Sequence, residues 1–543
     1  MTRFTRRRFI QGAAAMAAGG TMAGNARPHD DERASCEGAR DLHLVNGRFL
    51  TMDPRRPMVS ALAIRVGRIV ALGHADELGP CARTINLRGA SAIPGLMDSH
   101  VHFIRCGQNP GHEVRIIETA TSVAELSQMI SARIKELAVP AGEFITCVGG
   151  WNINGLAEKR LPTVAELDAA APNHAVYLST TGAGGAVTNT PGRAFFVSRG
   201  VTVNANGTLN AGLGLAALQA VQTEEDRQRG TSEAIDFAAS LGLTCVTDMG
   251  VAGAAVAGIP GFTYALKLWR DDNLKIRIRL YFNSSTDAGF TEAQGKIIHS
   301  LNQVGDDVFR PLGVGERTNA STTNVQFPEF LKFAAQNGWT VTQHSLTSGE
   351  IDFHIAAYQA VVAAQAGPID KLRWGLDHVN PISAAQTAAV KALGIVLRLQ
   401  GWNYTSANPA GPPWRSLVDS GIRLAGGTDS TNVGPLNPWL MMYYMTTMKN
   451  NAGVDATPAN QQITREEALR LYTAGSAYVS FDEEKLGSLE VGKLADVAVL
   501  SDDPLTVSAD RLRRIRSMLT LQAGRIVHGG DDDERLHGRR SRD

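Results

Sequence analysis

The sequence predicts a (β/α)8 barrel combined with a small β-sandwich that both ends of the chain build together. Two patterns support this fold class. Across residues 94–483, short apolar runs alternate with amphipathic stretches of helical periodicity, which is typical of parallel β–α–β units. Across 42–93 and 484–530, short strands are instead joined by tight turns. A chain of 543 residues has room for both units.

The terminal segments have the pattern of short strands. Asn46 with Gly47, and Ala523 with Gly524, stand between apolar runs as hairpin turns do. The predicted strand-bearing segments are 42–50, 61–73, 84–87, 495–500, 515–521 and 525–528. Because each terminal segment is too short to complete a core alone, we expect the two to pair into one sandwich.

The barrel strands follow from the apolar runs of the middle region. The eight predicted strands are 91–96, 243–248, 276–282, 310–316, 339–344, 373–378, 394–400 and 423–429. Amphipathic stretches such as 232–241, 328–337 and 384–393 fall between them. In such a barrel the active site lies at the carboxyl ends of the strands. Residues 103–225 are extra sequence between the first and second strands, and we expect them to form a lid over that site.

The composition favours a small-molecule substrate. The 53 basic and 53 acidic residues give no net charge, so no overall field attracts nucleic acid or an anionic membrane. The five cysteines are widely spaced and include no Cys-x-x-Cys pair, which indicates neither a disulfide framework nor a thiolate zinc site. The composition leaves open whether the protein forms a homo-oligomer.

The first residues predict export. Arg6 and Arg7 precede a short stretch rich in Ala and Gly within residues 1–26, a pattern that resembles a twin-arginine signal peptide read by the Tat export machinery. The polar residues 27–41 follow as a linker, and the charged tail 531–543 is expected to be disordered. No later apolar run is long enough to span a bilayer. We therefore expect a periplasmic or secreted protein with no membrane segment.

Histidines and one aspartate mark the ends of predicted strands. His100 and His102 lie two residues apart after the first strand, so their side chains point to the same side of the chain. His344 and His378 end later strands, and Asp429 ends the last one. Imidazole and carboxylate groups that converge at one barrel mouth suit a divalent metal. We expect Asp429 also to act as the general base on the attacking water.

Each of these residues has a simpler interpretation as well. A His-x-His pair alone is a weak signal, and His344 or His378 alone could be structural. Asp429 could instead cap the following helix. Asp98, two residues before His100, could orient a ligand rather than be one. The coincidence of such residues at successive strand ends favours the metal site.

The order of these residues resembles the amidohydrolase superfamily. Residues 94–103, PGLMDSHVHF, are similar to its opening signature, and residues 487–496, GSLEVGKLAD, are similar to its closing one. Residues 150–168 resemble the amidohydrolase-3 branch, which includes N-substituted formamide deformylase. The resemblance covers about residues 42–530. It implies a hydrolase acting on non-peptide C–N bonds of amides, carbamates or cyclic amides.

The resemblance also implies a bridging carboxylate. Members of the family often bridge two metals with a carboxylated lysine or a glutamate at the fourth strand. Residues 309–317 contain no lysine, so Glu316 is the expected bridge. The alternative for Glu316 is a surface ion pair with Arg317. Gly184 stands near the place of a histidine common in this branch, so we expect that substrate contact to be missing.

The implied ligand sets share this glutamate. They are His100, His102 and Glu316 for one ion, and Glu316, His344 and His378 for a second. Whether one or two ions bind stays open, and zinc is the expected metal. Water activated by the metal would attack the carbonyl, and Asp429 would pass the proton to the leaving nitrogen.

Two other functions stay open. A mononuclear aminohydrolase (a deaminase) of this fold often has a glutamate three residues after the strand-five histidine, where this chain has Thr347. A non-catalytic exported binding protein is the other alternative, and the intact set of strand-end histidines argues against it. The apolar run 439–445 is expected to be helix core, although it could line a pocket for an apolar substrate.

Overall fold

The computed structural model describes most of the chain between residues 38 and 530. The residues left out of this range are 39, 82, 182–184, 251–261, 285–289, 319–320, 432, 457 and 459. The predicted signal peptide, the tail at 531–543 and Gly184 therefore lie outside the described residues, as does most of the predicted linker.

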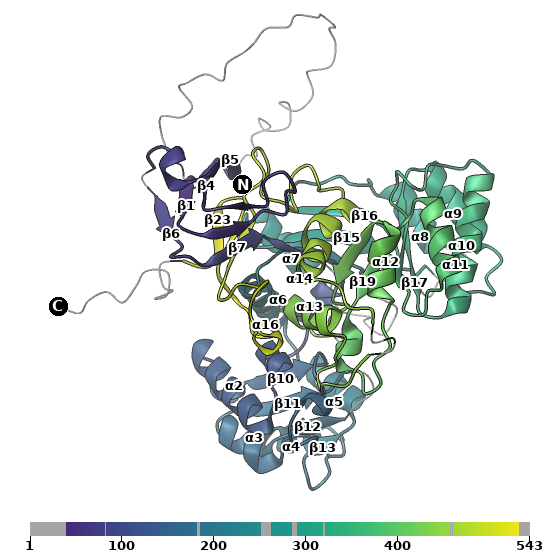
Figure 1. Ribbon diagram of the computed structural model, residues 1–543. Coiled ribbons are helices and arrows are strands. Elements are labelled where there is room, and N and C mark those ends of the chain that lie inside the picture. The colour runs from purple at the N-terminus through teal and green to yellow at the C-terminus, as the bar shows by residue number, and fades with distance from the viewer. Residues whose placement is uncertain are drawn as a thin grey trace, which may run out of the picture.

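Eight parallel strands form the central sheet (Figure 1). In sheet order they are β8 (Leu96–Val101), β14 (Leu243–Asp248), β15 (Arg277–Phe282), β16 (Phe309–Val314), β17 (Thr340–Ser345), β18 (Gly375–His378), β19 (Val396–Gln400) and β20 (Leu424–Gly427). The two outer strands meet at their carboxyl ends. The Asp429 N–H donates to the His100 carbonyl oxygen at 2.9 Å, and the His102 N–H donates to Ser430 at 2.8 Å. These bonds draw the sheet into a barrel.

Gly427 makes this closure possible. A Cβ atom at Gly427 would lie 2.8 Å from both the Cβ and the carbonyl oxygen of His100. Side chains do not approach a backbone that closely, so β8 and β20 could not meet at this point with any other residue.

Helices between the strands cover the outside of the barrel (Figure 1). They include α6 (Glu224–Ser240), α7 (Thr263–Arg270), α8 (Thr291–His299), α9 (Phe327–Gln336), α10 (Ser348–Ala363), α11 (Ala384–Leu393), α12 (Trp414–Ser420) and α13 (Pro438–Thr447). Their apolar faces join the strands in one hydrophobic cluster, in which Leu397 of β19 packs together with Val390 and Trp414 of the helices. The alternation of strand and helix predicted for this region is confirmed.

The predicted strand at 91–96 is wrong as the first barrel strand. Residues Ser91–Pro94 form β7, which pairs with β2 (Arg48–Leu50) and β21 (Val497–Leu500) in a different sheet. At Gly95 the backbone changes partner: the Gly95 N–H donates to Asp496, and the next N–H donates to Gly242 beside β14. The barrel therefore begins at β8, the strand that carries His100.

The two ends of the chain form two smaller sheets, the first from N-terminal strands alone and the second from strands of both ends. One has the order β5-β4-β1-β6 and the other β23-β22-β21-β7-β2-β3. Their remaining strands are β1 (Leu42–Val45), β3 (Met58–Val59), β4 (Ala61–Arg65), β5 (Arg68–Gly73), β6 (Thr84–Asn86), β22 (Ser517–Gln522) and β23 (Arg525–Gly529). Leu44 and Leu62 of the first sheet share a hydrophobic cluster with Val497 and Leu519 of the second. The two chain ends thus bury their apolar side chains together.

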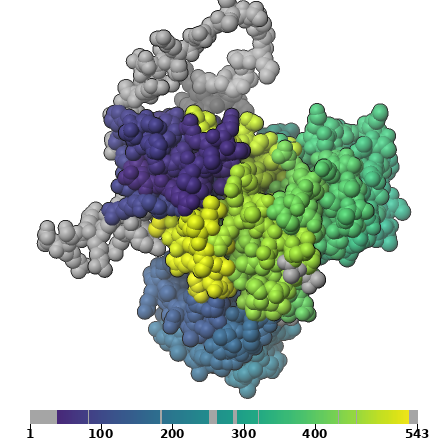
Figure 2. All heavy atoms as spheres, in the orientation of Figure 1, coloured from purple at the N-terminus to yellow at the C-terminus, as the bar shows by residue number. Residues whose placement is uncertain are grey.

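The sequence between β8 and β14 forms a lobe of its own. Its sheet contains β9 (His112–Glu113), β10 (Phe144–Val148), β11 (Ala175–Ser179), β12 (Ala186–Thr188) and β13 (Thr208–Leu209), flanked by α2 (Val123–Glu136), α3 (Val164–Ala170), α4 (Thr190–Ser198) and α5 (Ala211–Gln219). In Figure 2 the C-terminal residues, in yellow, lie between this blue lobe and the purple N-terminal strands.

The lobe contacts loops at the carboxyl ends of the barrel strands. Glu118 accepts hydrogen bonds from the N–H groups of Leu436 at 3.1 Å and Asn437 at 3.3 Å, both after β20. Asn152 donates to the Thr405 carbonyl, after β19. These contacts place the lobe on the side of the barrel where the predicted site lies.

The cysteines differ in one respect from the expectation. Cys106, Cys147 and Cys245 are free and buried, but Cys81 is disulfide-bonded. The wide cysteine spacing gave no indication of this bond. Within the described ranges, no helix has the length and apolar character needed to cross a membrane.

Candidate metal centre

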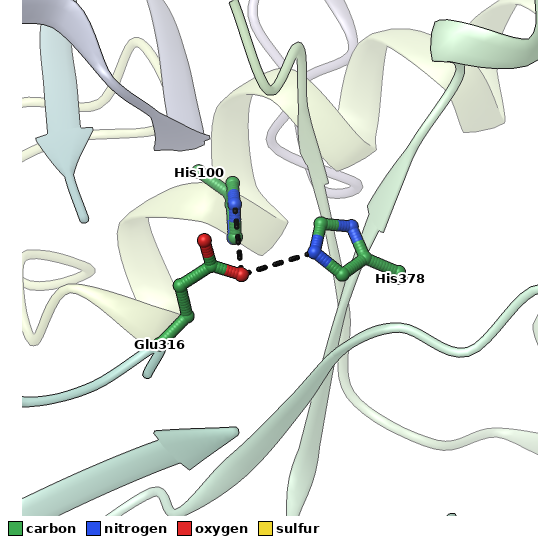
Figure 3. A group of neighbouring side chains, drawn as sticks. All are labelled: His100, Glu316 and His378. Carbon is green, nitrogen blue, oxygen red and sulfur yellow. Dashed lines mark hydrogen bonds and ion pairs between the residues drawn. The ribbon is translucent and has the colours of Figure 1, made fainter. Parts of the chain in front are cut away.

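The six predicted site residues meet at the carboxyl-terminal mouth of the barrel. Each comes from the end of a barrel strand: His100 and His102 from β8, Glu316 from the turn after β16, His344 from β17, His378 from β18, and Asp429 from the turn after β20. Figure 3 shows His100, Glu316 and His378 turned toward one another. Residues more than 300 positions apart in the chain thus share one site.

Glu316 stands at the centre of the four histidines. Its Oε2 atom lies 2.6 Å from His344 Nδ1, 3.1 Å from His378 Nε2 and 3.8 Å from His100 Nε2. Its Oε1 atom lies 3.3 Å from His102 Nε2. A carboxylate in contact with four imidazoles has the position expected of a bridging ligand.

Asp429 contacts three of the same four histidines. Its Oδ1 atom lies 3.5 Å from His100 Nε2 and 3.4 Å from His102 Nε2, and Oδ2 lies 3.8 Å from His378 Nδ1. Two buried triads result, in each of which one potential ligand atom per residue lies within 4.8 Å of the others. They are His100 with Glu316 and His378, and His100 with His102 and Asp429.

The chemistry of this group fits a divalent metal. All donor atoms are imidazole nitrogens or carboxylate oxygens, which bind zinc and similar ions. His100 Nε2 and His378 Nδ1 are buried and have no hydrogen-bond partner among the described residues. Burial of a polar atom without a hydrogen-bond partner costs free energy. A metal ion bound by these two nitrogens would supply the missing partner.

The electrostatics agree with a cation site. Burial acts to raise the pKa of Glu316, but hydrogen bonds from His102, His344 and His378 outweigh it and hold that pKa well below its usual range. Burial acts to lower the pKa of His102, but Asp429 and Glu316 raise it to about 9. The carboxylates of Glu316 and Asp429 are thus ionised at neutral pH, which suits them to bind a cation.

Two of the six residues have unusual backbone conformations. His378 has φ 73° and Asp429 has φ 55°, in the left-handed region that side chains other than glycine disfavour. Such conformations cost about 1–3 kcal/mol and are concentrated at functional sites. Here they turn the two side chains into the barrel mouth at the strand ends.

Asp377, which contacts the His100 imidazole, was not predicted from the sequence. His100 Nδ1 lies 3.1 Å from Asp377 Oδ1, and both side chains are fully buried. Asp377 in turn accepts from Thr342 Oγ1 at 2.5 Å, and Arg398 donates to that hydroxyl at 3.1 Å. A charged residue within each of two apolar runs, Asp377 and Arg398, was the available signal, because such residues must be paired when buried.

Asp98, predicted as a possible orienting residue for a metal ligand, binds the backbone at the strand ends instead. It accepts from the His100 backbone N–H at 3.0 Å and from the Thr428 hydroxyl at 2.6 Å. Asp98 therefore joins β8 to the segment after β20 through the His100 backbone N–H and the Thr428 side chain. Its effect on the site comes through the backbone that carries the ligands.

The simpler interpretations of Asp429 and Glu316 do not hold, whereas that of the apolar run 439–445 does. Asp429 caps no helix, because the N-cap of α13 is Asn437. Glu316 is 3% exposed, and its ion pair with Arg317 spans 3.9 Å, so it is not a surface pair. The apolar residues 439–445 are buried in the main hydrophobic cluster, which confirms the prediction of helix core.

A cavity of about 300 Å³ opens beside the group. Four of the six predicted residues reach its wall: His102, Glu316, His344 and Asp429. The remaining wall consists of two arginines and three apolar residues, namely Arg105, Arg317, Leu346, Trp402 and Val433. This volume suits a small molecule.

A comparison with protein families identifies the family of the chain. The model of the Amidohydrolase family matches residues 83–528 of this chain. The chain belongs to the Amidohydrolase family. As an amidohydrolase, it is a hydrolase that acts on carbon–nitrogen bonds.

Individual relatives of this amidohydrolase are distant. The N-substituted formamide deformylase of Arthrobacter pascens is 24% identical over 541 residues, which cover 89% of this chain and 98% of that protein. Among solved structures, an uncharacterized metal-dependent hydrolase from Pyrococcus furiosus has a TM-score of 0.56 at 22% identity, covering 86% of this chain and all of that one. Atrazine chlorohydrolase from Arthrobacter aurescens, complexed with zinc, has a TM-score of 0.53 at 17% identity, covering 90% and 95%. These structures share the fold of this amidohydrolase.

Proposed function

We propose that this amidohydrolase cleaves non-peptide C–N bonds of small amides, carbamates or cyclic amides with the help of a divalent metal. The observation that carries the proposal is the position of Glu316, whose two oxygens contact four histidines from three strands. The expected metal is zinc, as one or two ions, because the donors are nitrogen and oxygen and a solved structure of the same fold contains zinc. The relative that deformylates N-substituted formamides supports an amide-like substrate.

The ligand roles are taken from the resemblance to the family, and the contacts of Glu316 with the four histidines support them. We assign His100, His102 and Glu316 to one ion, and Glu316, His344 and His378 to a second. A bound divalent metal supplies a Lewis acid that polarises the carbonyl and lowers the pKa of water to about 7. The buried carboxylates keep their charge there, because their hydrogen bonds with the histidines stabilise the ionised form.

Asp429 is the residue placed to move the proton. Burial acts to raise the pKa of Asp429, but hydrogen bonds from His100 and His102 outweigh it and hold the pKa below its usual range. Asp429 is therefore ionised at neutral pH and can accept a proton at a carboxylate oxygen. It lines the cavity, so the same group can pass the proton to the leaving nitrogen.

The test combines metal analysis with a substrate panel. His100→Ala should lose at least half of the bound metal and nearly all hydrolysis of a panel of amides, carbamates and cyclic amides. His74→Ala, an exposed histidine next to β5, should leave both unchanged. A purified His100→Ala protein with full metal content and full rate would overturn the proposal.

The chain lacks the glutamate that deaminases of this fold often have after the strand-five histidine. Thr347 occupies the relevant position, and its side chain caps α10 by accepting from the Glu350 N–H at 3.2 Å. The carboxylate of Glu350 is itself held by the N–H groups of Leu346 and Thr347 at 2.9 Å. Ammonia release from an amidine-type compound in the same panel would favour the deaminase instead.

Export and domain organisation complete the proposal. The Arg6 and Arg7 pair supports delivery to the periplasm by the Tat machinery, where the disulfide at Cys81 would be stable. Replacement of both arginines by lysine should retain the protein in the cytoplasm, and unchanged export would contradict the signal. The hydrophobic cluster shared by the two terminal sheets supports their assignment as one composite β-sandwich domain beside the barrel.

A further inference from the structure

We propose that the substrate of this site carries a carboxylate, which Arg105 and Arg317 bind, beside an apolar arm. The inference rests on the proposed function, because it concerns the cavity next to the metal group. It goes further, since nothing about a metal-dependent hydrolase requires an anionic substrate. Both arginines line the 300 Å³ cavity together with His102, Glu316, His344 and Asp429.

Arg105 is a cation without an ion pair. It lies in α1 (Phe103–Gly107), just after His102, and is half-buried. No carboxylate of the described residues lies within 4.0 Å of its guanidinium. Its charge acts on Asp248, but the two oxygens of Asp248 accept from the N–H groups of Ile104 and Gly250, each at 2.7 Å. The guanidinium is therefore available to a ligand in the cavity.

Among the described residues, the close side-chain partner of Arg317 is the ring of His344. Its Nη2 atom lies 3.0 Å from His344 Nε2 and 3.3 Å from His344 Nδ1, and its nearest described carboxylate is that of Glu316 at 3.9 Å. The other ring nitrogen, His344 Nδ1, faces Glu316 Oε2 at 2.6 Å and His378 Nε2 at 2.8 Å. Nδ1 is thus the nitrogen turned toward the ligand group.

The orientation of the His344 ring affects the hydrogen bond from Arg317 when Nδ1 binds a metal ion. The proton of the neutral imidazole then resides on Nε2. Nε2–H cannot accept a hydrogen bond from Arg317, so the guanidinium loses its acceptor. Arg317 is 45% exposed at the cavity and needs another acceptor there. A carboxylate is the acceptor that matches the planar fork of a guanidinium.

The remaining wall is apolar. Leu346, Trp402 and Val433 supply carbon surface to the cavity and no charge. The cavity therefore offers two cations on one part of its wall and an apolar surface on another. Because the charges of Glu316 and Asp429 are balanced by a single divalent ion, the two arginines leave the loaded cavity with a net positive charge. An amide with a carboxylate and an aliphatic or aromatic arm fits both surfaces.

The test uses two ketones that resemble amides but cannot be hydrolysed. In 2-benzyl-4-oxopentanoate and 5-phenylpentan-2-one a CH2 replaces the amide N–H, and the two differ only in the carboxylate. Calorimetry with the metal-loaded enzyme should show the carboxylate compound binding at least about tenfold more tightly, as hydrogen bonds to charged groups imply. Arg105→Gln and Arg317→Gln should each lower that preference several-fold and leave the neutral ketone unaffected.

Two controls separate this proposal from the proposed function. Arg88→Gln, an exposed arginine of the N-terminal segment, should keep the full preference. Hydrolysis is measured separately, with N-acetylphenylalanine and N-acetyl-2-phenylethylamine, in which water adds across the C–N bond to give acetate and the amine. Failure to cleave any panel compound would count against the proposed function alone. Equal affinities for the two ketones, or a preference that survives in the Arg105→Gln, Arg317→Gln double variant, would overturn the carboxylate site.

Discussion

The carboxylate of Asp377 lies 3.1 Å from Nδ1 of His100, and neither side chain is exposed to solvent. This contact fixes the ring so that the opposite nitrogen, Nε2, faces Glu316 and Asp429. The carboxylate is itself held by Thr342, to which Arg398 also donates. A chain of buried polar groups inside the barrel thus determines the direction of a residue common to both metal triads.

Asp377→Asn should weaken metal binding through this contact. The amide cannot accept the His100 N–H with the same charge assistance, so the ring loses its fixed orientation. Loss of such a partner typically costs about 10–100-fold in metal affinity or activity. Competition with a chelator measures the affinity, and circular dichroism checks that the variant is folded. Asp455→Asn, an exposed aspartate paired with Lys449, is the matched control and should bind metal normally. Unchanged chelator resistance in Asp377→Asn would refute the orienting role.

Glu316→Gln should reduce the metal content of the purified protein by at least half. The substitution preserves the size of the side chain but removes the charge that four histidines surround. Hydrolysis should fall by at least about 100-fold, since metal-assisted activation of water depends on the site. Metal analysis by mass spectrometry gives the stoichiometry. Glu329→Gln removes an exposed charge paired with Lys332 and should change neither quantity. Near-normal stoichiometry in Glu316→Gln would show that this residue is not the bridge.

Gly427→Ala should destabilise the protein and disturb the site. The new Cβ would lie 2.8 Å from the Cβ and the carbonyl oxygen of His100, so β8 and β20 must separate. Overpacking of this kind costs about 1–3 kcal/mol. Gly295→Ala provides a contrast, because Gly295 lies in α8 with no atom within 4 Å of the added Cβ. That change should stabilise the helix by up to about 1 kcal/mol. Thermal unfolding that fails to separate the two variants would argue against the close approach.

The sequence predicted the strands well where each is a short apolar run bounded by turns. The run at 243–248 coincides with β14, and 394–400 contains β19. The prediction failed at 91–96, because this run spans the end of β7 and the start of β8, which are separated at Gly95. The change of sheet occurs at Gly95, where a Cβ would lie 2.3 Å from Thr244 Oγ1. Two of the strands that determine that change, β21 beside β7 and β14 beside β8, lie more than 100 residues away in the sequence.

The site residues were predictable for a related reason. His100, His344, His378 and Asp429 stand at the ends of predicted strands, and barrel topology brings strand ends together. Asp377 was not singled out, although it directly precedes His378, because its partner His100 lies 277 residues away in sequence. The two arginines of the cavity were missed as well. Among the described residues, their sole carboxylate contact within ion-pair distance is the one between Arg317 and Glu316 at 3.9 Å, a property that only a folded structure reveals.

His112 should make the stability of the protein depend on pH. It lies in β9, and its ring nitrogens contact Glu143 at 2.6 Å and Glu233 of α6 at 2.8 Å. Burial and the nearby Arg229 act to lower the pKa of His112, but the hydrogen bonds with Glu233 and Glu143 outweigh both and raise it. The protonated ring therefore joins the lobe between β8 and β14 to the barrel. Because the folded-state pKa lies above the ordinary value of about 6.5, the stabilisation is complete below that pH and is lost as the pH rises through the folded-state value.

The measurement is the free energy of unfolding of wild type and His112→Gln between pH 6 and pH 9. At pH 6 the variant should be less stable by about 1–3 kcal/mol, because it loses charge-assisted hydrogen bonds to two carboxylates. The difference should shrink as the pH rises through the folded-state pKa of the ring. Glu233→Gln removes one of the two carboxylates and should reduce this pH dependence partially. His74→Gln changes an exposed histidine of the N-terminal segment and should leave the pH dependence unchanged. A loss of stability in His112→Gln that is equal at both pH values would mean that the ring contributes by packing, and that its protonation does not hold the lobe to the barrel.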